Sequence, residues 1–242
     1  MPAPKKLPTF KTEHFKFYRV QIDQRPANIP TSLKGQFEPP DLRPRRHKVI
    51  LLTFFGIPVS KNQARVRNRR THLSWYELAS AQEPRRTVGV TNQFGTDVLT
   101  LGDPEFLLAP ALKQAGDKPQ PADLPADVSH FKGYRILEHK QFDPRTVTLQ
   151  DQFDREPVKF KVDAPIYFCV PVQKTVGDKT WPAVNPEEHL VIYPIAPRSY
   201  DEKRPVWDQF KGGLLRNFRA YFLAVPTLKS VVKRGVVAKL DF

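Results

Sequence analysis

Polar and apolar residues alternate with a period of two in short segments along this chain. In the first of them, residues 14–20, Phe15 and Phe17 fall on one face, whereas His14 and Lys16 fall on the other. Alternation of this kind is typical of a β-strand with one buried face.

The segment that begins at residue 72 shows the pattern most regularly. We expect strands separated by turns rich in Gly, Pro, Asn and Asp, the strands being His72–Leu78, Thr87–Thr91, Asp97–Leu101 and Phe106–Ala109. The last turn is expected at 102–104, where the sequence reads Gly-Asp-Pro. Short strands at this spacing favour an all-β fold.

Three other segments complete this picture. Residues 49–59 form the longest apolar run, which we interpret as a buried strand, since a membrane-spanning helix needs roughly 20 apolar residues. Residues 207–221 are the best candidate for helical periodicity, but they align with β segments elsewhere in the chain. A final strand is expected at 231–240.

The same three motifs recur four times in a fixed order. Each unit begins with His-[Phe/Leu]-x-x-Tyr, continues to a Gln-Phe pair, and ends with an apolar run, a proline and a lysine three residues later. The motifs begin at His14, His72, His130 and His189; at Gln36, Gln93, Gln152 and Gln209; and at Pro58, Pro110, Pro171 and Pro226. The histidines are 58, 58 and 59 residues apart. Four copies of one unit therefore account for nearly the whole chain.

The repeats form two related pairs. Repeats one and three share His-Phe-Lys-x-Tyr-Arg, whereas repeats two and four share His-Leu-x-x-Tyr. We expect an extended tail at 1–12, repeats one and two in 13–116, a Pro- and Asp-rich linker at 117–129, and repeats three and four in 130–242. Pairing two repeats hides strand edges. The predicted fold is therefore two β-barrel or β-sandwich domains, and the alternative is one four-bladed β-propeller.

The motifs resemble those of an uncharacterised bacterial tandem β-repeat domain that is usually found in secreted or envelope proteins. The family pattern reads roughly His-Phe-Lys-Cys-Tyr-Lys-Val, then Asp-Gln-Phe-Gly, then Leu-Cys-Val-Pro-x-x-Lys, and the resemblance covers all four repeats. Members of that family lack a known catalytic activity. The resemblance thus implies an architecture and a cellular context rather than a reaction.

The chain departs from that family pattern at the cysteines. Family members usually have paired cysteines in the first and last motifs, but here only Cys169 is present. The first-motif positions hold Phe17, Trp75, Gly133 and Ile192, and the last-motif positions hold Gly56, Leu108 or Ala109, Cys169 and Ala224. We expect apolar packing to replace the disulfides, which weakens the implication of secretion. Cys169 itself is expected to be a small buried side chain rather than a nucleophile.

Four evenly spaced histidines raise the question of a metal site. Each is followed by Tyr four residues later, but no Cys, Asp or Glu recurs beside it at ligand spacing, so we interpret the His-Tyr pairs as structural. Asp151 and Asp208 precede Gln-Phe pairs, where a turn-forming role is more common than acid–base catalysis. The sequence has no phosphate-binding glycine loop, nucleophile elbow or His-Glu-x-x-His motif. We therefore predict a protein that is not an enzyme and needs no cofactor or metal.

Charge is the remaining functional signal. The chain has 39 Lys and Arg against 25 Asp and Glu, and residues 1–116 hold 19 of the basic and 9 of the acidic residues. Such an excess favours a polyanionic partner. The candidate contact residues flank the apolar run 49–59, and they are Arg43, Arg45, Arg46, Lys48, Arg65, Arg67, Arg69 and Arg70. A strand of that length would hold the two groups roughly 35 Å apart, so they form either one broad face or two separate rims.

The predicted function is a structural or attachment subunit whose basic first half docks onto an acidic protein surface or an anionic envelope component in a larger assembly. The alternative is a nucleic-acid-binding protein that uses the same half. Base stacking is less suited to this chain, because its aromatic residues fall in strands rather than among the arginines. The N-terminus lacks the apolar stretch of a signal peptide. The expected location is thus cytoplasmic, or extracellular or in the cell envelope if a signal was removed.

Overall fold

The computed structural model describes residues 9–20, 28–39, 41, 43–113, 124–201, 203–208, 210, 212–216, 218–233 and 236–237. These residues form strands and connecting loops without a helix, which confirms the all-β prediction. This part of the chain accordingly contains no helix that is long and apolar enough to cross a membrane.

Each repeat begins with one strand, ends with another and has one or two strands between them. Repeat one contains β1 (Phe15–Arg19), β2 (Ile29–Gly35) and β3 (Arg45–Pro58), followed by the short β4 (Ser60–Lys61). Repeat two contains β5 (His72–Ala79), β6 (Arg86–Asn92) and β7 (Gly95–Leu112). Repeat three contains β8 (His130–Glu138), β9 (Arg145–Gln150), β10 (Val158–Val162) and β11 (Tyr167–Val176), followed by the short β12 (Lys179–Trp181). Repeat four contains β13 (Glu188–Ser199), β14 (Lys203–Asp208), β15 (Gly212–Arg216) and β16 (Arg219–Lys233), followed by β17 (Val236–Val237).

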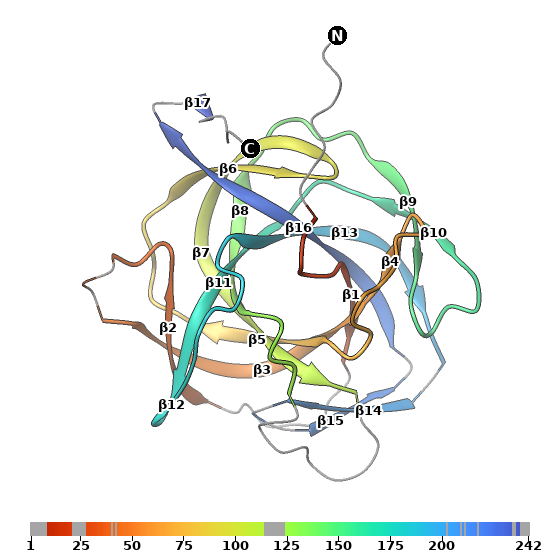
Figure 1. Cartoon of the computed structure of the whole chain (residues 1–242), viewed down its shortest axis with the longest axis horizontal. Coiled ribbons are helices and arrows are strands. Elements are labelled where there is room, and N and C mark those ends of the chain that lie inside the picture. The colour runs from red at the N-terminus through yellow and green to blue at the C-terminus, as the bar shows by residue number, and fades with distance from the viewer. Residues whose placement is uncertain are drawn as a thin grey trace.

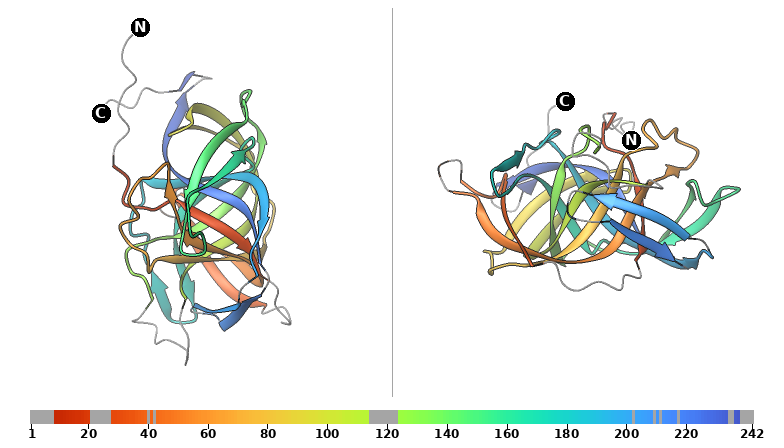
Figure 2. Two further views of the ribbon diagram at one scale, coloured as in Figure 1. Left: turned by 90° about the vertical axis from the view of Figure 1, so that its right-hand side faces the viewer. Right: turned by 90° about the horizontal axis from the view of Figure 1, so that it is seen from below.

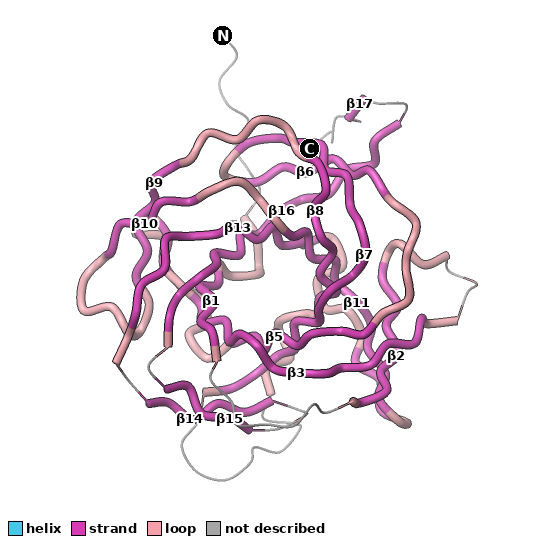
Figure 3. The backbone as a smooth tube through the Cα atoms, turned by 180° about the vertical axis from the view of Figure 1, so that it is seen from behind, coloured by secondary structure: helices cyan, strands magenta, loops and turns pink. Residues whose placement is uncertain are grey.

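The strands that begin and end the repeats form one closed ring. The hydrogen-bonded neighbours run β1–β3–β5–β7–β8–β11–β13–β16, and β16 pairs back with β1, every pair being antiparallel. Figure 1 shows this ring from one side and Figure 3 shows it from behind. Figure 2 shows that the ring strands are inclined to its axis. Closure gives each ring strand a partner on both sides.

Four strands between them connect repeats that lie opposite each other in the ring, and we call them the crossing strands: β2, β6, β9 and β14. β2 of repeat one pairs with β11 of repeat three, and β9 of repeat three pairs with β4 of repeat one. In the same way, β6 of repeat two pairs with β16 of repeat four, and β14 of repeat four pairs with β7 of repeat two. Opposite repeats thus exchange strands in both directions.

This pairing differs from the arrangement expected from the sequence. Two separate domains would confine pairing to repeats one and two or to repeats three and four, whereas the ring crosses between the halves at β7–β8 and at β16–β1. A propeller would form one sheet per repeat, whereas here a single sheet includes all of them. The expected tail and linker are described only at 9–12 and 124–129, and both stretches hydrogen-bond to other parts of the chain, for example Thr12 N to Glu188 and Thr71 to Asp127.

Side chains that point into the ring form an inner core. Trp75 on β5 lies at its centre. Its ring contacts the aromatic rings of Phe54 and Phe106 on the neighbouring strands β3 and β7. It also contacts the rings of Tyr167 on β11 and Phe222 on β16. The inner core takes residues from every ring strand: Phe15, Phe17, Phe54, Leu73, Trp75, Phe106, Leu108, Phe131, Tyr167, Cys169, Leu190, Ile192, Phe222 and Ala224.

A second core lies between the outer face of the ring and the crossing strands. Tyr18 on β1 illustrates it, since its ring packs edge-on against Phe153, Tyr200 and Phe218. The alternation predicted for residues 14–20 therefore separates two apolar cores rather than a core from solvent. That is why even the polar residue Lys16 on the second face is fully buried.

One predicted turn is absent. Residues 102–104 were expected to separate two strands, but they lie within β7, which runs unbroken from Gly95 to Leu112. The pairing of β7 with β8 shifts register on both sides of Pro104. The Gly-Asp-Pro sequence therefore bends a continuous strand, as a β-bulge does, instead of reversing it.

Candidate functional site: the inter-repeat joints and the arginine loop

The Tyr of each first motif packs against the Phe of the Gln-Phe pair two repeats away. The ring pairs are Tyr18–Phe153, Tyr76–Phe210, Tyr134–Phe37 and Tyr193–Phe94, all edge-to-face with centroids 4.8 to 5.5 Å apart. Aromatic pairs in this geometry are more favourable than their buried area alone implies. Two motifs that are far apart in each repeat thus meet across the ring.

The lysine of each last motif lies over the same Phe ring. The distances from Nζ to the ring centroid are 4.9 Å for Lys61–Phe94, 5.4 Å for Lys113–Phe153, 4.5 Å for Lys174–Phe210 and 5.6 Å for Lys229–Phe37. Each contact is a cation–π interaction between one repeat and the next, and the fourth joins the last repeat to the first. We call each set of Tyr, Lys and Gln-Phe an inter-repeat joint.

Lys174 is the most enclosed of these cations. Its Nζ lies 4.2 Å from the Trp181 ring as well as over Phe210, and it has no hydrogen-bond partner among the described residues. Burial lowers its pKa to about 7, against the opposing effect of Asp208. The aromatic faces thus replace part of the solvation that the ammonium group loses.

The repeated histidines lie buried beside the joints. His72 Nδ1 is 2.8 Å from the carbonyl oxygen of Arg70, and His189 Nδ1 is 3.1 Å from that of Glu187. Both rings stack on a phenylalanine of the second core, Phe55 and Phe168 respectively. Burial lowers the pKa of His72 to about 4 and that of His189 to about 3, so both are neutral at pH 7. Within the described residues, no group of three or more His, Cys, Asp or Glu is placed to hold a metal ion.

The residue before each Gln-Phe pair shapes the turn. Asp151 Oδ1 accepts a hydrogen bond from Phe153 N at 2.9 Å, and Asp208 Oδ1 accepts one from Phe210 N at 2.7 Å. Asn92 makes the same contact in repeat two. These are Asx turns, which confirms the turn-forming role predicted for Asp151 and Asp208.

Repeats one and three are also joined by buried ion pairs. Lys16 Nζ of repeat one lies 2.5 Å from Asp154 Oδ2 and 3.3 Å from Asp151 Oδ2 of repeat three, and all three side chains are fully buried. Tyr18 and Tyr200 donate hydrogen bonds to the same two carboxylates. Burial raises the pKa of Asp151 despite the opposing charge of Lys16.

The reciprocal ion pair runs from repeat three to repeat one. Lys132 Nζ contacts Glu38 Oε1 and lies 3.0 Å from Glu83 Oε1, which repeat two supplies. Burial alone would raise the pKa of Glu38, but Lys132 and hydrogen bonds lower it. The titratable groups of both clusters are therefore engaged with each other across the repeats.

Four of the predicted arginines lie on one loop, residues 62–71, which we call the arginine loop. Arg65, Arg67, Arg69 and Arg70 are all exposed on it. Glu13 anchors the loop, because its Oε1 accepts hydrogen bonds from the backbone N of Arg67 at 2.8 Å and of Asn68 at 3.2 Å. Asn68 and Thr71 in turn donate to Asp127. Arg67 Nε also lies 3.4 Å from Glu13 Oε1. The loop is thus anchored by acidic side chains, and its four arginines remain exposed.

The arginine loop begins with an unusual backbone conformation. Asn62 and Gln63 both have positive φ, 50° and 66° respectively. Asn tolerates this left-handed region, whereas Gln adopts it only when the surroundings impose it. Asn62 is held by two hydrogen bonds to the backbone of Thr148 on β9. Repeat three therefore fixes the start of the loop.

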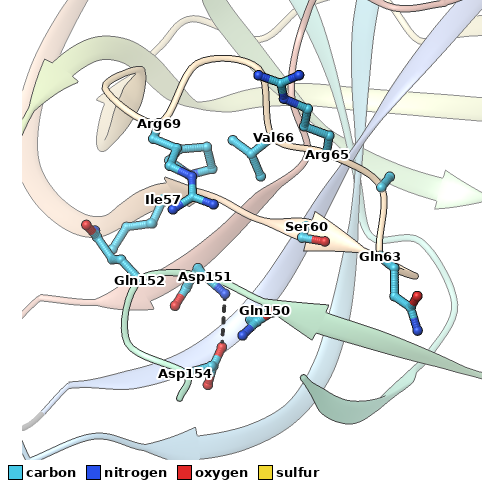
Figure 4. A pocket seen from close by; sticks show the side chains of 12 residues that line it. Ile57, Ser60, Gln63, Arg65, Val66, Arg69, Gln150, Asp151, Gln152 and Asp154 are labelled. Atoms are coloured by element: carbon cyan, nitrogen blue, oxygen red, sulfur yellow. Dashed lines mark hydrogen bonds between the residues drawn. The ribbon is translucent and has the colours of Figure 1, made fainter. Parts of the chain in front are cut away.

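A pocket of about 560 Å³ lies between the arginine loop and the turn that follows β9. Figure 4 shows Arg69 extending from the loop toward Asp151 and Gln152, whereas the Arg65 guanidinium lies at the outer edge. The carboxylates at the base belong to the buried cluster around Lys16. The pocket therefore offers exposed cations at its rim and acidic groups that are already paired at its base.

The first group of predicted basic residues lies elsewhere. Arg43 precedes β3, and Arg45, Arg46 and Lys48 lie at its start, where the strand pairs with β2. The arginine loop follows the opposite end of β3. Of the two alternatives left open by the sequence, the structure thus shows two separate rims. Arg43, Arg46 and Lys48 are exposed, and Arg45 is half-buried.

Comparison with known proteins identifies a family. The profile of a repeat of unknown function, DUF7450, matches residues 72–226, which is well over half of the chain. The chain belongs to this family. No curated protein and no solved structure matches it significantly.

The DUF7450 match spans repeats two to four, and repeat one shows the same motifs and the same joints. The first- and last-motif positions that correspond to the paired cysteines of the resembled pattern lie directly opposite each other on neighbouring ring strands: Phe17–Gly56, Trp75–Leu108, Gly133–Cys169 and Ile192–Ala224. This register selects Leu108 over Ala109. All of these side chains or glycines face the inner core, so large and small residues fill the space together, and burial raises the pKa of Cys169.

Sequence reasoning alone missed two components of this site. Glu13 and Asp127 anchor the arginine loop, but each lies just before a His motif or within the expected linker, where no periodic pattern marks it. The pairing of Lys16 with Asp154 and of Lys132 with Glu38 did leave a signal. Only repeats one and three have both a Lys in the first motif and an acid directly after Gln-Phe.

Proposed function

We propose that this protein is a non-catalytic structural or attachment module that docks onto an acidic protein surface through the arginine loop. The observation that supports it most directly is the combination of exposure and anchoring in that loop. Four exposed arginines lie on a backbone held by Glu13, Asp127 and Thr148, so the backbone of the loop loses little conformational freedom on binding. Arginine on such a scaffold is well suited to carboxylates, which it can bind with two parallel hydrogen bonds.

The use of the other polar groups supports a structural role. The repeated Tyr, Lys and Gln-Phe residues make inter-repeat joints, and the buried acids of repeats one and three pair with Lys16 and Lys132. These groups stabilise the ring rather than face a substrate. The arginine loop is the conspicuous polar feature that the ring does not require.

Binding to immobilised poly-glutamate tests the proposal. Replacing Arg65, Arg67, Arg69 and Arg70 together by Gln should change the thermal midpoint only slightly, because the four side chains are exposed and the Arg67–Glu13 ion pair at 3.4 Å is only partly buried. It should also strongly lower the salt concentration needed for elution, since screened surface charges drive the contact.

A matched control removes the same charge elsewhere, by replacing the exposed residues Lys140, Lys159, Lys161 and Lys179 with Gln. Equal loss of retention in both variants would show that net charge alone matters and would contradict the proposal. A third variant, with Arg43, Arg45, Arg46 and Lys48 replaced by Gln, tests whether the other rim contributes.

Double-stranded DNA serves as the competing ligand. Nucleic acid binding would show a steep linear dependence of log affinity on log salt concentration, because counterions are released from the phosphates. If the arginine-loop variant loses DNA binding with such a slope while poly-glutamate binding stays weak, the nucleic-acid alternative replaces the acidic protein.

A further inference from the structure

Another pocket, with a volume of about 400 Å³, lies against the middle of β3 and the part of β5 from Trp75 to Leu78. Its aromatic lining comes from five ring strands: Phe54, Trp75, Phe106, Tyr167 and Phe222. Four of these residues occupy one repeated position, four residues before the proline of the last motif.

Trp75 organises the aromatic lining. Its ring stacks on those of Phe106 and Phe222, with ring centroids 3.7 Å and 5.5 Å apart, and the centroid of the Phe54 ring lies 5.2 Å away. Trp75 and Phe106 are almost fully buried, whereas Phe54 and Phe222 are half-buried at the opening. The inner core thus ends in a surface of π faces rather than in aliphatic side chains.

The charges that line this pocket are acidic. In a protein with a formal charge of +14, the ionisable side chains among its described lining residues are Glu77, Glu105 and Tyr167. Glu77 is exposed and has no ion-pair partner within the described residues. Glu105 accepts a hydrogen bond from the Tyr167 hydroxyl at 2.8 Å.

One cation of the chain already uses this chemistry. The Arg135 guanidinium lies 5.3 Å from the Tyr167 ring and donates to its hydroxyl. Arg135 does not line the pocket. It occupies Tyr167, and Trp75 is stacked on both Phe106 and Phe222. The half-buried rings of Phe54 and Phe222, together with Glu77, remain for another group.

We propose that this aromatic pocket binds an organic cation of the quaternary ammonium class. A methylated ammonium group is large, weakly hydrated and positive, so it is attracted to aromatic faces and to a nearby carboxylate at the same time. The two glutamates would repel an anion, and they would provide no charge attraction for a neutral apolar ligand. The site is distinct from the arginine loop, because none of its described lining residues comes from residues 62–71.

Calorimetric titration with choline tests the proposal, using the neutral carbon isostere of choline, in which a tert-butyl group replaces the trimethylammonium, for comparison. We expect choline to saturate one site and the isostere to bind at least about fivefold more weakly. N-trimethyl-lysine, titrated in parallel, shows whether the site takes the cation as an amino-acid side chain or only as a small free molecule.

Variants locate the site. Glu77→Gln should weaken choline binding by roughly two- to fivefold, the range of exposed charge pairs, and Phe54→Leu should weaken it further while keeping the site apolar. Glu138→Gln, an exposed glutamate outside the pocket, should have no effect. Equal affinity for choline and its isostere, the absence of saturable binding, or equal effects of Glu77→Gln and Glu138→Gln would each overturn the proposal.

Discussion

Lys16 and Lys132 each bury an ammonium group against the turn of the opposite repeat. Removing such a charge from water is costly unless a well-placed acid compensates it, and Asp154 and Glu38 do so. Repeats two and four have Ser74 and Val191 in place of these lysines. Repeats one and three therefore share these lysines and acids because the two repeats contact each other through them.

The buried histidines make stability depend on pH. Burial, reinforced by a nearby lysine, lowers the pKa of His14 and His189 to about 3 and that of His72 to about 4. In the unfolded chain a histidine titrates near 6.5, so below that pH the unfolded state binds more protons than the folded one. The free energy of unfolding is therefore highest, with respect to these histidines, above about pH 6.5. As the pH falls from there toward 4, it decreases by about 1.4 kcal/mol per pH unit for each histidine.

Urea unfolding between about pH 6.5 and 4.5 measures this dependence. His72→Gln should make the slope of the unfolding free energy against pH shallower by about one proton. The same change at His139, which is exposed, serves as the matched control. If His72→Gln retains the slope of the parent protein, the histidine does not remain neutral in the folded state.

At the scale of the elements, the ring interior depends on matching large and small residues across neighbouring strands. Gly56 faces Phe17, and Gly133 of β8 lies beneath Phe106 of β7. A Cβ on Gly133 would lie 2.1 Å from Cζ of Phe106, whose ring is itself held against Trp75. The register of β7 and β8 thus requires a residue without a side chain at this position.

Gly133→Ala should therefore lower the free energy of unfolding by about 1–3 kcal/mol, as overpacking of a closed core does. Adding Phe106→Leu to the same chain should restore part of the loss, because it frees the space above the new methyl group. Chemical denaturation of the two variants measures both effects.

Gly102→Ala is the matched control. The three atoms nearest its new Cβ would all belong to the side chain of Leu137, which is 45 % exposed and free to move away. A loss at Gly102 as large as that at Gly133 would show that the cost comes from the backbone and not from the contact with Phe106.

The whole molecule is held together by exchange between opposite repeats. Each crossing strand pairs with a strand two repeats away, and the last repeat closes onto the first through β16–β1 and through Lys229 over Phe37. No boundary between residues 13–116 and 130–242 can be drawn without breaking these contacts. The two halves therefore depend on each other for their cores.

We expect the two halves to remain together when the chain is cut. A protease site introduced within 117–129 should yield two fragments that elute as one species and unfold in a single transition. Each half expressed alone should lack the cooperative unfolding of a folded domain, and mixing them should restore it. A half that is stable and cooperative by itself would show that the exchanged strands are dispensable.

Local order in this protein follows from the sequence. The period of two predicts strands, the recurrence of His-Tyr, Gln-Phe and Pro-Lys predicts four copies of one unit, and Asp before Gln-Phe predicts a turn, because each depends on neighbouring residues only. The burial of Cys169 follows equally from its apolar surroundings. The two groups of basic residues were likewise recognisable, since exposed charge interrupts an apolar pattern.

Tertiary structure alone decided how the repeats combine. A period of two shows that a strand has two faces, but not that both are covered, so it could not reveal the second core or the burial of Lys16. Pairing between β2 and β11 joins residues more than a hundred positions apart, and no local pattern specifies which distant edge a strand meets. The single ring, the anchoring of the arginine loop and the aromatic pocket all depend on that choice, because each is built from repeats that only the closed sheet brings together.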